Sequence, residues 1–441
     1  MKRIQTAITV FEFGYLGVGD KAEQSKRITK ISKAAFTYLK QLCLCDESES
    51  RFLSLKSIES SEVLQLQNYA GVLFTPDGTQ IEVLPKIGRK LDGEDGKEKA
   101  RGSLLNMLAT LGTFRHIQTH SANLTKSKMP LLEVFISQFL DSVNTLVKRG
   151  LRSDYVSRES NLSYLKGKLL VGKQIRKNSI NKHKFYVEHD EFLLDRPINR
   201  LIHTALNKVS NYSSSAKNQK LSKELMFAFA DIPLSINVKK DLSAIKLDRG
   251  MNYYKVPFEW TKLVLDGFSP LTMQGSNYAF SLLFPLEAVF ESYVASVLQT
   301  LLPEHMTLDT QVKTESLATF NKCKFFQLRP DLFITNKQST NVVLDTKWKL
   351  IDSTKDNGTD KFGLSQSDLY QMFAYGHKYL DGNGELFLIY PSHDDFIEPI
   401  QYGFKYSDNL KLWVIPFDVS PNIKHGVSRI TFPKNSDFQI G

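Results

Sequence analysis

The chain has 441 residues, 41% hydrophobic and 24% charged, a composition that is typical of globular domains, and its length predicts two or three of them. No stretch approaches the roughly 20 apolar residues of a membrane span, and the N-terminus lacks the apolar region of a signal peptide, so we expect a cytoplasmic protein without membrane contact. The net charge of +10 suits a polyanionic partner such as nucleic acid, although charge alone does not identify one.

The three cysteines do not form a metal-binding pattern. Cys43 and Cys45 are too close in sequence for an ordinary disulfide, and Cys323 is remote from both. No histidine cluster accompanies them, and a zinc site needs about four ligands at suitable spacing. We therefore expect reduced cysteines that pack as small apolar residues.

The N-terminal part alternates between strand and helix patterns. Residues 8–13, 62–67, 71–75 and 80–84 predict strands, and apolar residues at helical spacing predict a helix over 29–44. The turn signature Pro76-Asp77-Gly78-Thr79 joins two of these strands into a hairpin over 71–84. The charged, glycine-containing segment 88–99 predicts an exposed loop.

The middle of the chain is predicted to be helical. Residues 130–147 and 197–209 each carry a proline near the start, where the missing N–H costs nothing. The polar segment 210–219 predicts another exposed loop. A break in the apolar pattern near 272–276 suggests a boundary, which divides the chain into an α+β region, residues 1–275, and an α/β domain, residues 276–441. We expect the first region to dock a partner and to contact DNA, with two subdomains as an alternative to one.

The C-terminal part follows the order helix, strand, strand, helix, strand. An apolar helical face runs from Leu286 to Leu301 and ends before Pro303. Residues 324–335 and 341–350 predict two strands around a polar turn. Residues 366–380 predict a helix, and residues 385–390 a short apolar strand that Pro391 stops.

The strongest chemical signal is Arg329-Pro330-Asp331, followed by Val342-Val343-Leu344-Asp345-Thr346-Lys347. Side chains alternate along a strand, so Asp345 and Lys347 point to one face. If the two strands form a hairpin, Asp331 lies close to Asp345 or to Thr346. The sequence does not fix the register, and a bulge could turn Asp331 to the other face.

These residue types suit phosphodiester hydrolysis. Carboxylates such as Asp331 and Asp345 can hold Mg²⁺, which stabilises charge on phosphoryl oxygens, and Lys347 could orient the attacking water. A bare Asp-x-Lys is more often a solvated strand face or an ion pair. Here three apolar residues before Asp345 indicate a buried strand, and a buried carboxylate needs a cation.

Neighbouring helices offer further candidates. Gln371 and Tyr375 are four residues apart, share a helix face and could position the lysine or the scissile strand. Alternatively, Tyr375 is a core residue and Gln371 a surface one. Glu291, or Glu287 one turn earlier, could supply a third carboxylate, although solvent exposure is the commoner outcome for either.

Two features of the segment 166–184 need separate interpretations. Gly167 to Lys173 has the spacing of a phosphate-binding loop, but Gln174 follows where a Ser or Thr should bind Mg²⁺, and no apolar strand precedes it. We therefore reject a nucleotide site there. Seven basic residues and no acid suit contact with DNA phosphates, with a solvated basic face as the alternative: Lys166, Lys168, Lys173, Arg176, Lys177, Lys182 and Lys184.

Several tracts in order along the chain resemble the McrC family, the nuclease subunit of McrBC modification-dependent restriction systems. They are Asn68-Tyr69-Ala70-Gly71-Val72, residues 81–87, 104–108, 148–151, 165–168 and 195–200, Phe290-Glu291-Ser292-Tyr293-Val294, Arg329-Pro330-Asp331, Asp345-Thr346-Lys347-Trp348-Lys349 and Asp368-Leu369-Tyr370-Gln371. The resemblance covers most of the chain, but residues 352–363 and those beyond Pro391 fit it less clearly.

The resemblance implies a PD-(D/E)xK (restriction-endonuclease-like) nuclease domain that requires Mg²⁺. It implies metal binding by Asp331 and Asp345, catalysis by Lys347, and cleavage of double-stranded DNA with a GTP-hydrolysing AAA+ partner that reads modified cytosine. Two alternatives stay open: a self-sufficient repair nuclease of the same fold, and a non-catalytic assembly factor that stimulates a GTPase.

Overall fold

The computed structural model describes residues 8–19, 28–45, 52–58, 61–88, 93–111, 129–265, 281–336, 341–421 and 428–440. They form two compact units, one built from residues 1–131 and 270–441 and the other from residues 132–269. This grouping differs from the predicted division into 1–275 and 276–441, and the predicted boundary at 272–276 lies outside the described residues. None of the described helices is both long and apolar enough to cross a membrane.

The first unit combines residues from both ends of the chain, because a strand from the C-terminal half joins a sheet that N-terminal strands form. The order is β1 (Ile8–Phe11), β7 (Gln80–Leu84), β6 (Tyr69–Phe74) and β11 (Ser281–Pro285), with β6 and β7 forming the predicted hairpin. Gly71 has φ +142°, and a Cβ there would lie 1.8 Å from the Leu282 carbonyl oxygen. Glycine therefore lets β6 and β11 approach each other.

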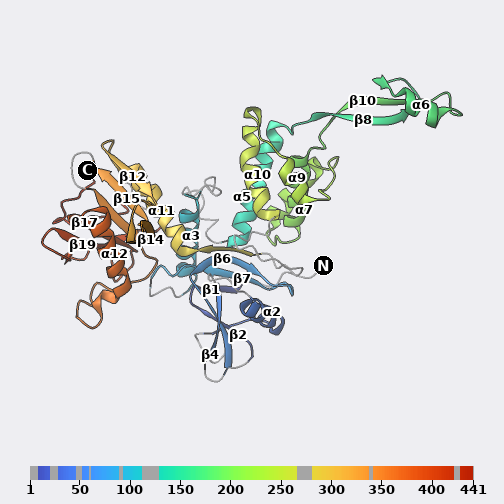
Figure 1. Cartoon of the computed structure of the whole chain (residues 1–441). Coiled ribbons are helices and arrows are strands. Elements are labelled where there is room, and N and C mark those ends of the chain that lie inside the picture. The colour runs from blue at the N-terminus through green and yellow to red at the C-terminus, as the bar shows by residue number, and fades with distance from the viewer. Residues whose placement is uncertain are drawn as a thin grey trace. The chain divides into compact units, whose positions relative to one another are not determined.

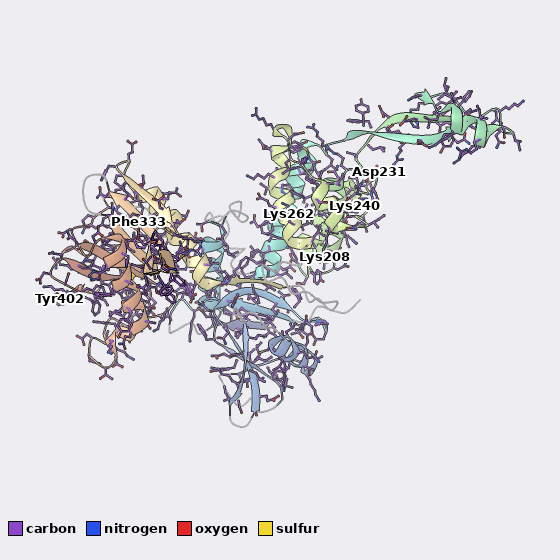
Figure 2. All side chains as sticks on the ribbon, in the orientation of Figure 1. Lys208, Asp231, Lys240, Lys262, Phe333 and Tyr402 are labelled. Carbon is purple, nitrogen blue, oxygen red and sulfur yellow. The ribbon has the colours of Figure 1, made fainter. Side chains whose placement is uncertain are left out.

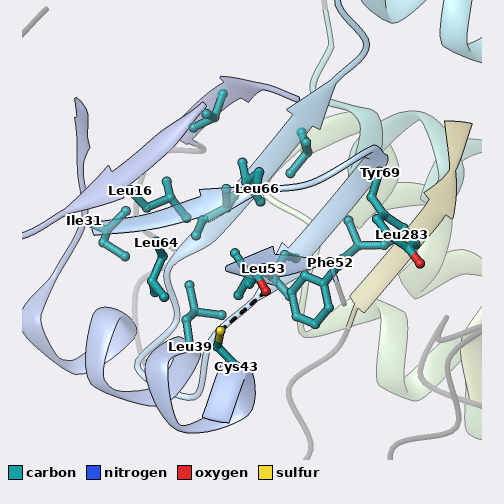
Figure 3. Packing of buried hydrophobic residues seen from close by; sticks show 14 of the residues in the cluster. Leu16, Ile31, Leu39, Cys43, Phe52, Leu53, Leu64, Leu66, Tyr69 and Leu283 are labelled. Atoms are coloured by element: carbon teal, nitrogen blue, oxygen red, sulfur yellow. Dashed lines mark hydrogen bonds between the residues drawn. The ribbon is translucent and has the colours of Figure 1, made fainter. Parts of the chain in front are cut away.

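A second sheet of the first unit has the order β3 (Ile28–Lys30), β2 (Tyr15–Gly17), β5 (Ser61–Leu66) and β4 (Leu53–Ile58). Helix α2 (Lys33–Cys45) confirms the predicted helix and packs Leu39 and Cys43 against Leu53 and Leu64 (Figure 3). Cys43 is buried, and its thiol donates to the Leu53 carbonyl at 3.4 Å. Neither Cys43 nor the exposed Cys323 forms a disulfide, whereas the side chain of Cys45 lies outside the described part of the chain.

The predicted loop over 88–99 is wrong from Gly93 onward, where α3 (Gly93–Leu108) begins. The charged residues that suggested a loop lie in its first turns, where Glu94 and Asp95 favour a helix N-terminus. Further along, Leu104 and Met107 are buried, and Arg101 donates two hydrogen bonds of 2.8 Å to the buried Glu82 of β7. Buried contacts made by the second half of α3 therefore stabilise the helix. These contacts involve residues beyond the segment 88–99, so the composition of that segment could not predict them.

The second unit consists of helices and a long antiparallel ribbon. The helices are α5 (Leu131–Arg149), α7 (Pro197–Ser210), α8 (Ala216–Ala228), α9 (Val238–Ala244), η3 (Arg249–Tyr254) and α10 (Lys255–Leu265). The ribbon pairs β8 (Asp154–Leu162) with β10 (Phe185–Leu193), and α6 (Val171–Asn178) lies at its tip (Figure 1). The predicted helices over 130–147 and 197–209 are confirmed, and the predicted loop over 210–219 shortens because α8 begins at Ala216.

The segment that imitates a phosphate-binding loop has an ordinary structural explanation. Lys168 and Leu169 form β9, a two-residue strand antiparallel to β10. Gly167 has φ +75°, and a Cβ there would lie 2.4 Å from the Glu188 carbonyl oxygen. The glycine is needed for this close approach to β10.

The C-terminal part contains α11 (Leu286–Leu301), α12 (Gln366–Tyr379) and a six-stranded sheet. The sheet order is β12 (Met306–Thr310), β15 (Leu332–Asn336), β16 (Val342–Thr346), β17 (Gly384–Pro391), β19 (Leu410–Phe417) and β18 (Phe404–Lys405). Both helices and the strands β16 and β17 were predicted. The predicted strand over 324–335 is wrong, because Arg329-Pro330 separates β15 from β14 (Cys323–Gln327), which pairs with β13 (Ser316–Phe320) in a ribbon of its own.

The two helices pack on opposite faces of the six-stranded sheet. Met372 and Tyr375 of α12 pack in one cluster with Leu386 and Leu388 of β17. On the other face, the ring centroid of Phe290 in α11 lies 5.8 Å from that of Phe417 in β19. The central strands β17 and β19 are therefore buried on both faces, which explains their continuous apolar runs.

Candidate active site

The hairpin of β15 and β16 fixes the register that the sequence left open. Leu332 pairs with Leu344, so Asp331, just before β15, lies beside the end of β16. Its Oδ2 accepts hydrogen bonds from the backbone N–H of Thr346 at 2.8 Å and from the Thr346 hydroxyl at 2.7 Å. The predicted proximity of Asp331 to Thr346 is confirmed.

Asp345 and Lys347 share one face at the end of β16, as alternation predicts. Asp345 is only 1% exposed, and its Oδ2 accepts a hydrogen bond from Lys347 Nζ. The same ammonium group donates to Gln371 Oε1 at 3.2 Å. The backbone N–H of Lys347 donates to the Ile389 carbonyl at 2.9 Å. This bond extends the pairing with β17 and holds the lysine at the end of β16.

The charged groups at the end of β16 strongly influence one another's pKa. Burial raises the pKa of Asp345 to about 7, and the charge of Asp331 acts in the same direction, whereas Lys347 lowers it. Burial alone would lower the pKa of Lys347, but the charge of Asp345 raises it above its ordinary value. Lys347 is therefore a cation across the physiological range, next to a buried carboxylate, Asp345, whose charged form is disfavoured.

Gln371 and Tyr375 extend the site onto α12. Gln371 Nε2 donates to the Tyr375 hydroxyl at 2.6 Å, and that hydroxyl donates to the Arg329 carbonyl at 2.9 Å. Tyr375 also packs in the core, and burial raises its pKa to about 12, so it stays protonated. A chain of hydrogen bonds thus runs from the segment before Asp331 to Lys347.

The structure brings Glu291, and not Glu287, to the side of Asp331. Gln311 Nε2 donates to Glu291 Oε1 and lies 3.3 Å from Asp331 Oδ1. Burial and the charge of Asp331 raise the pKa of Glu291. Glu287 instead accepts from Asn68 Nδ2 at 2.9 Å. Sequence reasoning missed Gln311, because no spacing rule connects it with Glu291 on α11.

Asp368 is a second residue that sequence reasoning left without a role. It lies one helical turn before Gln371, and its charge raises the pKa of both Asp345 and Lys347. Its Oδ2 accepts a hydrogen bond from the Tyr390 hydroxyl at 3.4 Å. The i,i+3 spacing to Gln371 was the signal that could have identified it.

The donor set suits a hard cation with few protein ligands. Among the described residues, no three acidic, histidine or cysteine side chains converge as a complete metal cage. Mg²⁺ does not need one, since it usually binds one or two carboxylates and keeps several waters. Asp331 and Asp345 offer those carboxylates. Burial, reinforced by the charge of Asp331, raises the pKa of Asp345, and a bound divalent cation would favour the charged form.

The segment after Lys347 is held by an N-terminal residue. Trp348 Nε1 donates to both carboxylate oxygens of Glu12, at 2.8 and 3.1 Å, and the Lys86 N–H donates to Glu12 Oε1 at 2.6 Å. A cavity of about 890 Å³ lies alongside, lined in part by Glu12, Lys86 and Lys347. Glu12 therefore links β1 to the strand end that carries the candidate site.

Glu12 also makes the stability of this unit depend on pH. Burial raises the pKa of Glu12 to about 7 in the folded protein. The stabilisation that protonated Glu12 gives the folded state is therefore fully present below the pKa of this glutamate in the unfolded chain. It is lost as the pH rises through about 7. Relative to Glu12→Gln, the wild type should lose about 3 kcal/mol of unfolding free energy between about pH 5 and about pH 8.

Urea unfolding at both pH values measures this difference, with Glu62→Gln, at an exposed position of β5, as the matched control. Equal pH dependence in the wild type and in Glu12→Gln would contradict the assignment.

The fold and the site together define a mixed α/β protein. Its carboxylate–lysine centre lies where β15 begins and β16 ends, within a six-stranded sheet. Residues 64–391 match the family model described as "McrBC 5-methylcytosine restriction system component". The match spans more than half of the chain, so the chain belongs to this family, and the predicted family resemblance is confirmed.

One solved structure supports the fold. The chain is similar to a chain of the Thermococcus gammatolerans half-complex of McrB AAA+ hexamers with bound McrC, with 21% identity, coverage of 94% of this chain and 95% of that chain, and a TM-score of 0.66. It is also similar to a chain of the Thermococcus gammatolerans McrBC complex, with 22% identity, coverage of 68% and 89%, and a TM-score of 0.47. A comparison with curated proteins finds no match.

Proposed function

We propose that the chain is a Mg²⁺-dependent DNA endonuclease subunit of a McrBC-type restriction complex, with a PD-(D/E)xK domain formed by residues 276–441. The convergence of Asp331, Asp345 and Lys347 at the ends of β15 and β16 carries the proposal. A solvated strand face would not bury Asp345 to 1% exposure beside a second carboxylate. A buried ion pair alone would not need Asp331, whose charge disfavours ionisation of Asp345.

Each side chain has a defined task in the proposed reaction. Asp331 and Asp345 would hold Mg²⁺, which when bound supplies a Lewis acid that stabilises negative charge on the phosphoryl oxygens. Lys347 Nζ would orient the attacking water and offset charge in the transition state. Gln371 and Tyr375 hold Lys347 in place through their hydrogen-bond chain. Glu291 would add a third carboxylate, with Gln311 spacing it from Asp331.

The partner assignment rests on family membership. The similar solved assembly contains McrB AAA+ hexamers together with McrC. We propose that this chain likewise binds a GTP-hydrolysing AAA+ partner that selects DNA with modified cytosine, and that it stimulates this partner. The N-terminal sheets and the second unit supply much more surface than the candidate site occupies, and residues 1–275 would provide the docking surface.

A cleavage assay with modified and unmodified duplex DNA tests the proposal. The chain and its AAA+ partner, supplied with GTP and Mg²⁺, should cut modified DNA, and omission of either protein should prevent cutting. Efficient cleavage by the chain alone with Mg²⁺ would favour a self-sufficient nuclease instead.

The basic run at the tip of the β8–β10 ribbon should contribute to DNA affinity. Lys168, Arg176, Lys177 and Lys182 are exposed, whereas Lys173 is paired with Glu159. Changing these four exposed residues to Gln should lower the slope of log affinity against log salt by up to about 4, because fewer counterions are released. Fluorescence anisotropy over a salt series measures the slope.

The matched control changes exposed lysines of α8, namely Lys217, Lys220 and Lys223, to Gln. An unchanged slope in the ribbon variant would show that the basic run is a solvated face.

A further inference from the structure

The ribbon of β13 and β14 exposes several aromatic side chains. Phe320 is 72% exposed, Phe326 is 74% exposed, and every residue of β14 is exposed. An isolated two-stranded ribbon is at best marginally stable in water, and a cluster of exposed aromatic rings commonly marks a binding surface. Phe326 also has φ +56°, a backbone conformation that is unfavourable for a bulky residue.

The base of this ribbon is attached directly to the candidate active site. The backbone N–H of Gln311 donates to the Asp331 carbonyl at 2.9 Å, and the Gln311 side chain contacts Asp331 and Glu291. The Tyr379 hydroxyl of α12 lies 3.1 Å from the carbonyl oxygens of Val312 and Leu328, the two residues that flank the ribbon. The base of the ribbon therefore lies beside Asp331, a residue of the candidate site.

The charge of the ribbon identifies the kind of molecule that covers it. Residues 311–329 contain four basic side chains and one acidic one: Lys313, Lys322, Lys324, Arg329 and Glu315. Lysines between exposed phenylalanines suit a polyanion with apolar faces, because ammonium groups bind phosphates while aromatic rings contact bases. A second copy of this chain would bring the same positive charges against each other.

We propose that the β13–β14 ribbon is a DNA-contacting element that places Phe326 and Phe320 against bases next to the scissile phosphate, with Lys322 on the flanking phosphates. This inference rests on the proposed nuclease function and names the residues that hold its substrate. The ribbon would fix the position of the duplex relative to Asp331 and Lys347 without reading sequence, because stacking and phosphate contacts tolerate any base.

Equilibrium binding separates this contact from catalysis. Duplex DNA that carries 2-aminopurine is titrated with the full-length chain in an Asp345→Ala background, so that binding is measured without cleavage. Phe326→Ala should weaken binding on the order of tenfold and abolish the 2-aminopurine fluorescence change, while Phe326→Tyr should retain both. Tyr402→Ala is the matched control, because Tyr402 is 73% exposed near β18, the edge of the sheet opposite β12 (Figure 2).

A cross-linking experiment tests the same surface without altering an aromatic residue. Cys323 is exposed at the start of β14 and Cys43 is buried, so a maleimide photo-cross-linker can be attached to Cys323 in a Cys45→Ser protein. Irradiation should join the chain to DNA. Cross-linking to a second copy or to another protein in place of DNA would overturn the proposal.

The remaining outcomes distinguish the ribbon from the proposed nuclease. Unchanged DNA binding by Phe326→Ala and Phe320→Ala, in a chain that still cuts DNA with its partner, would overturn the ribbon assignment alone. Loss of binding in these variants, in a chain whose wild-type form binds DNA but never cuts it, would support the ribbon and refute the nuclease.

Discussion

Replacing Asp345 with alanine is expected to abolish DNA cleavage while the fold and partner binding persist. Asp345 is buried at the end of β16, beside Asp331 and Lys347, and it offers one of the two carboxylates that Mg²⁺ would need. Loss of the bound cation removes several kcal/mol of transition-state stabilisation, which corresponds to a decrease of about 10³-fold or more in rate. Asp331→Ala should behave in the same way, because either loss leaves the ion under-coordinated.

Two controls make the Asp345 result specific. Asp345→Asn retains the shape of the side chain and should also be inactive, which separates the loss of charge from the loss of packing. Asp356→Ala removes an exposed carboxylate from the insert between β16 and α12 and should leave the rate unchanged. Cleavage at the wild-type rate by Asp345→Ala would refute the metal site.

The Asp345→Ala chain also tests the proposed division of labour. GTP turnover by the AAA+ partner is measured with and without the inactive chain. Stimulation equal to that by the wild type is expected, because Asp345 lies in the C-terminal sheet and the proposed docking surface lies in residues 1–275. A full-length chain is needed, since a fragment that ends at residue 275 would lack β11, which completes the N-terminal sheet.

Replacing Lys347 with alanine is expected to lower the cleavage rate by about 10²–10³-fold while Mg²⁺ still binds. Lysine is no metal ligand, so the loss should be in the rate at saturating Mg²⁺ and not in the metal affinity. The charge of Lys347 lowers the pKa of Asp345, so its removal raises that pKa further. Rates are therefore compared over a pH series, so that a shift in the pKa of Asp345 is separated from the loss of the lysine.

Lys349→Ala is the matched control, because Lys349 lies two residues further on and is exposed, with its Nζ 2.6 Å from the Gly363 carbonyl. A normal rate at saturating Mg²⁺ combined with a large loss of metal affinity would show that Lys347 serves the metal and not the reaction. Unchanged cleavage under all conditions would favour a chain that only stimulates its partner.

Local pattern alone determined much of the candidate site. Alternation placed Asp345 and Lys347 on one face of β16, and the apolar run before them predicted a buried strand, which the 1% exposure of Asp345 confirms. The polar turn between the two strands predicted a hairpin that brings Asp331 close. Helical spacing put Gln371 and Tyr375 together on α12. These features depend on residues a few positions apart, for which backbone geometry fixes the side-chain directions.

Only the tertiary structure decided the rest. The register that sets Asp331 against Thr346, the placement of Gln311 between Glu291 and Asp331, and the bond from Trp348 to Glu12 join residues that are distant in sequence. Helix α3 is a further example. The composition of its first turns is typical of a loop, but buried contacts with β7 stabilise the helix. Such contacts depend on which elements pack together, and the free energy of that packing comes from buried area and paired charges that no local pattern contains.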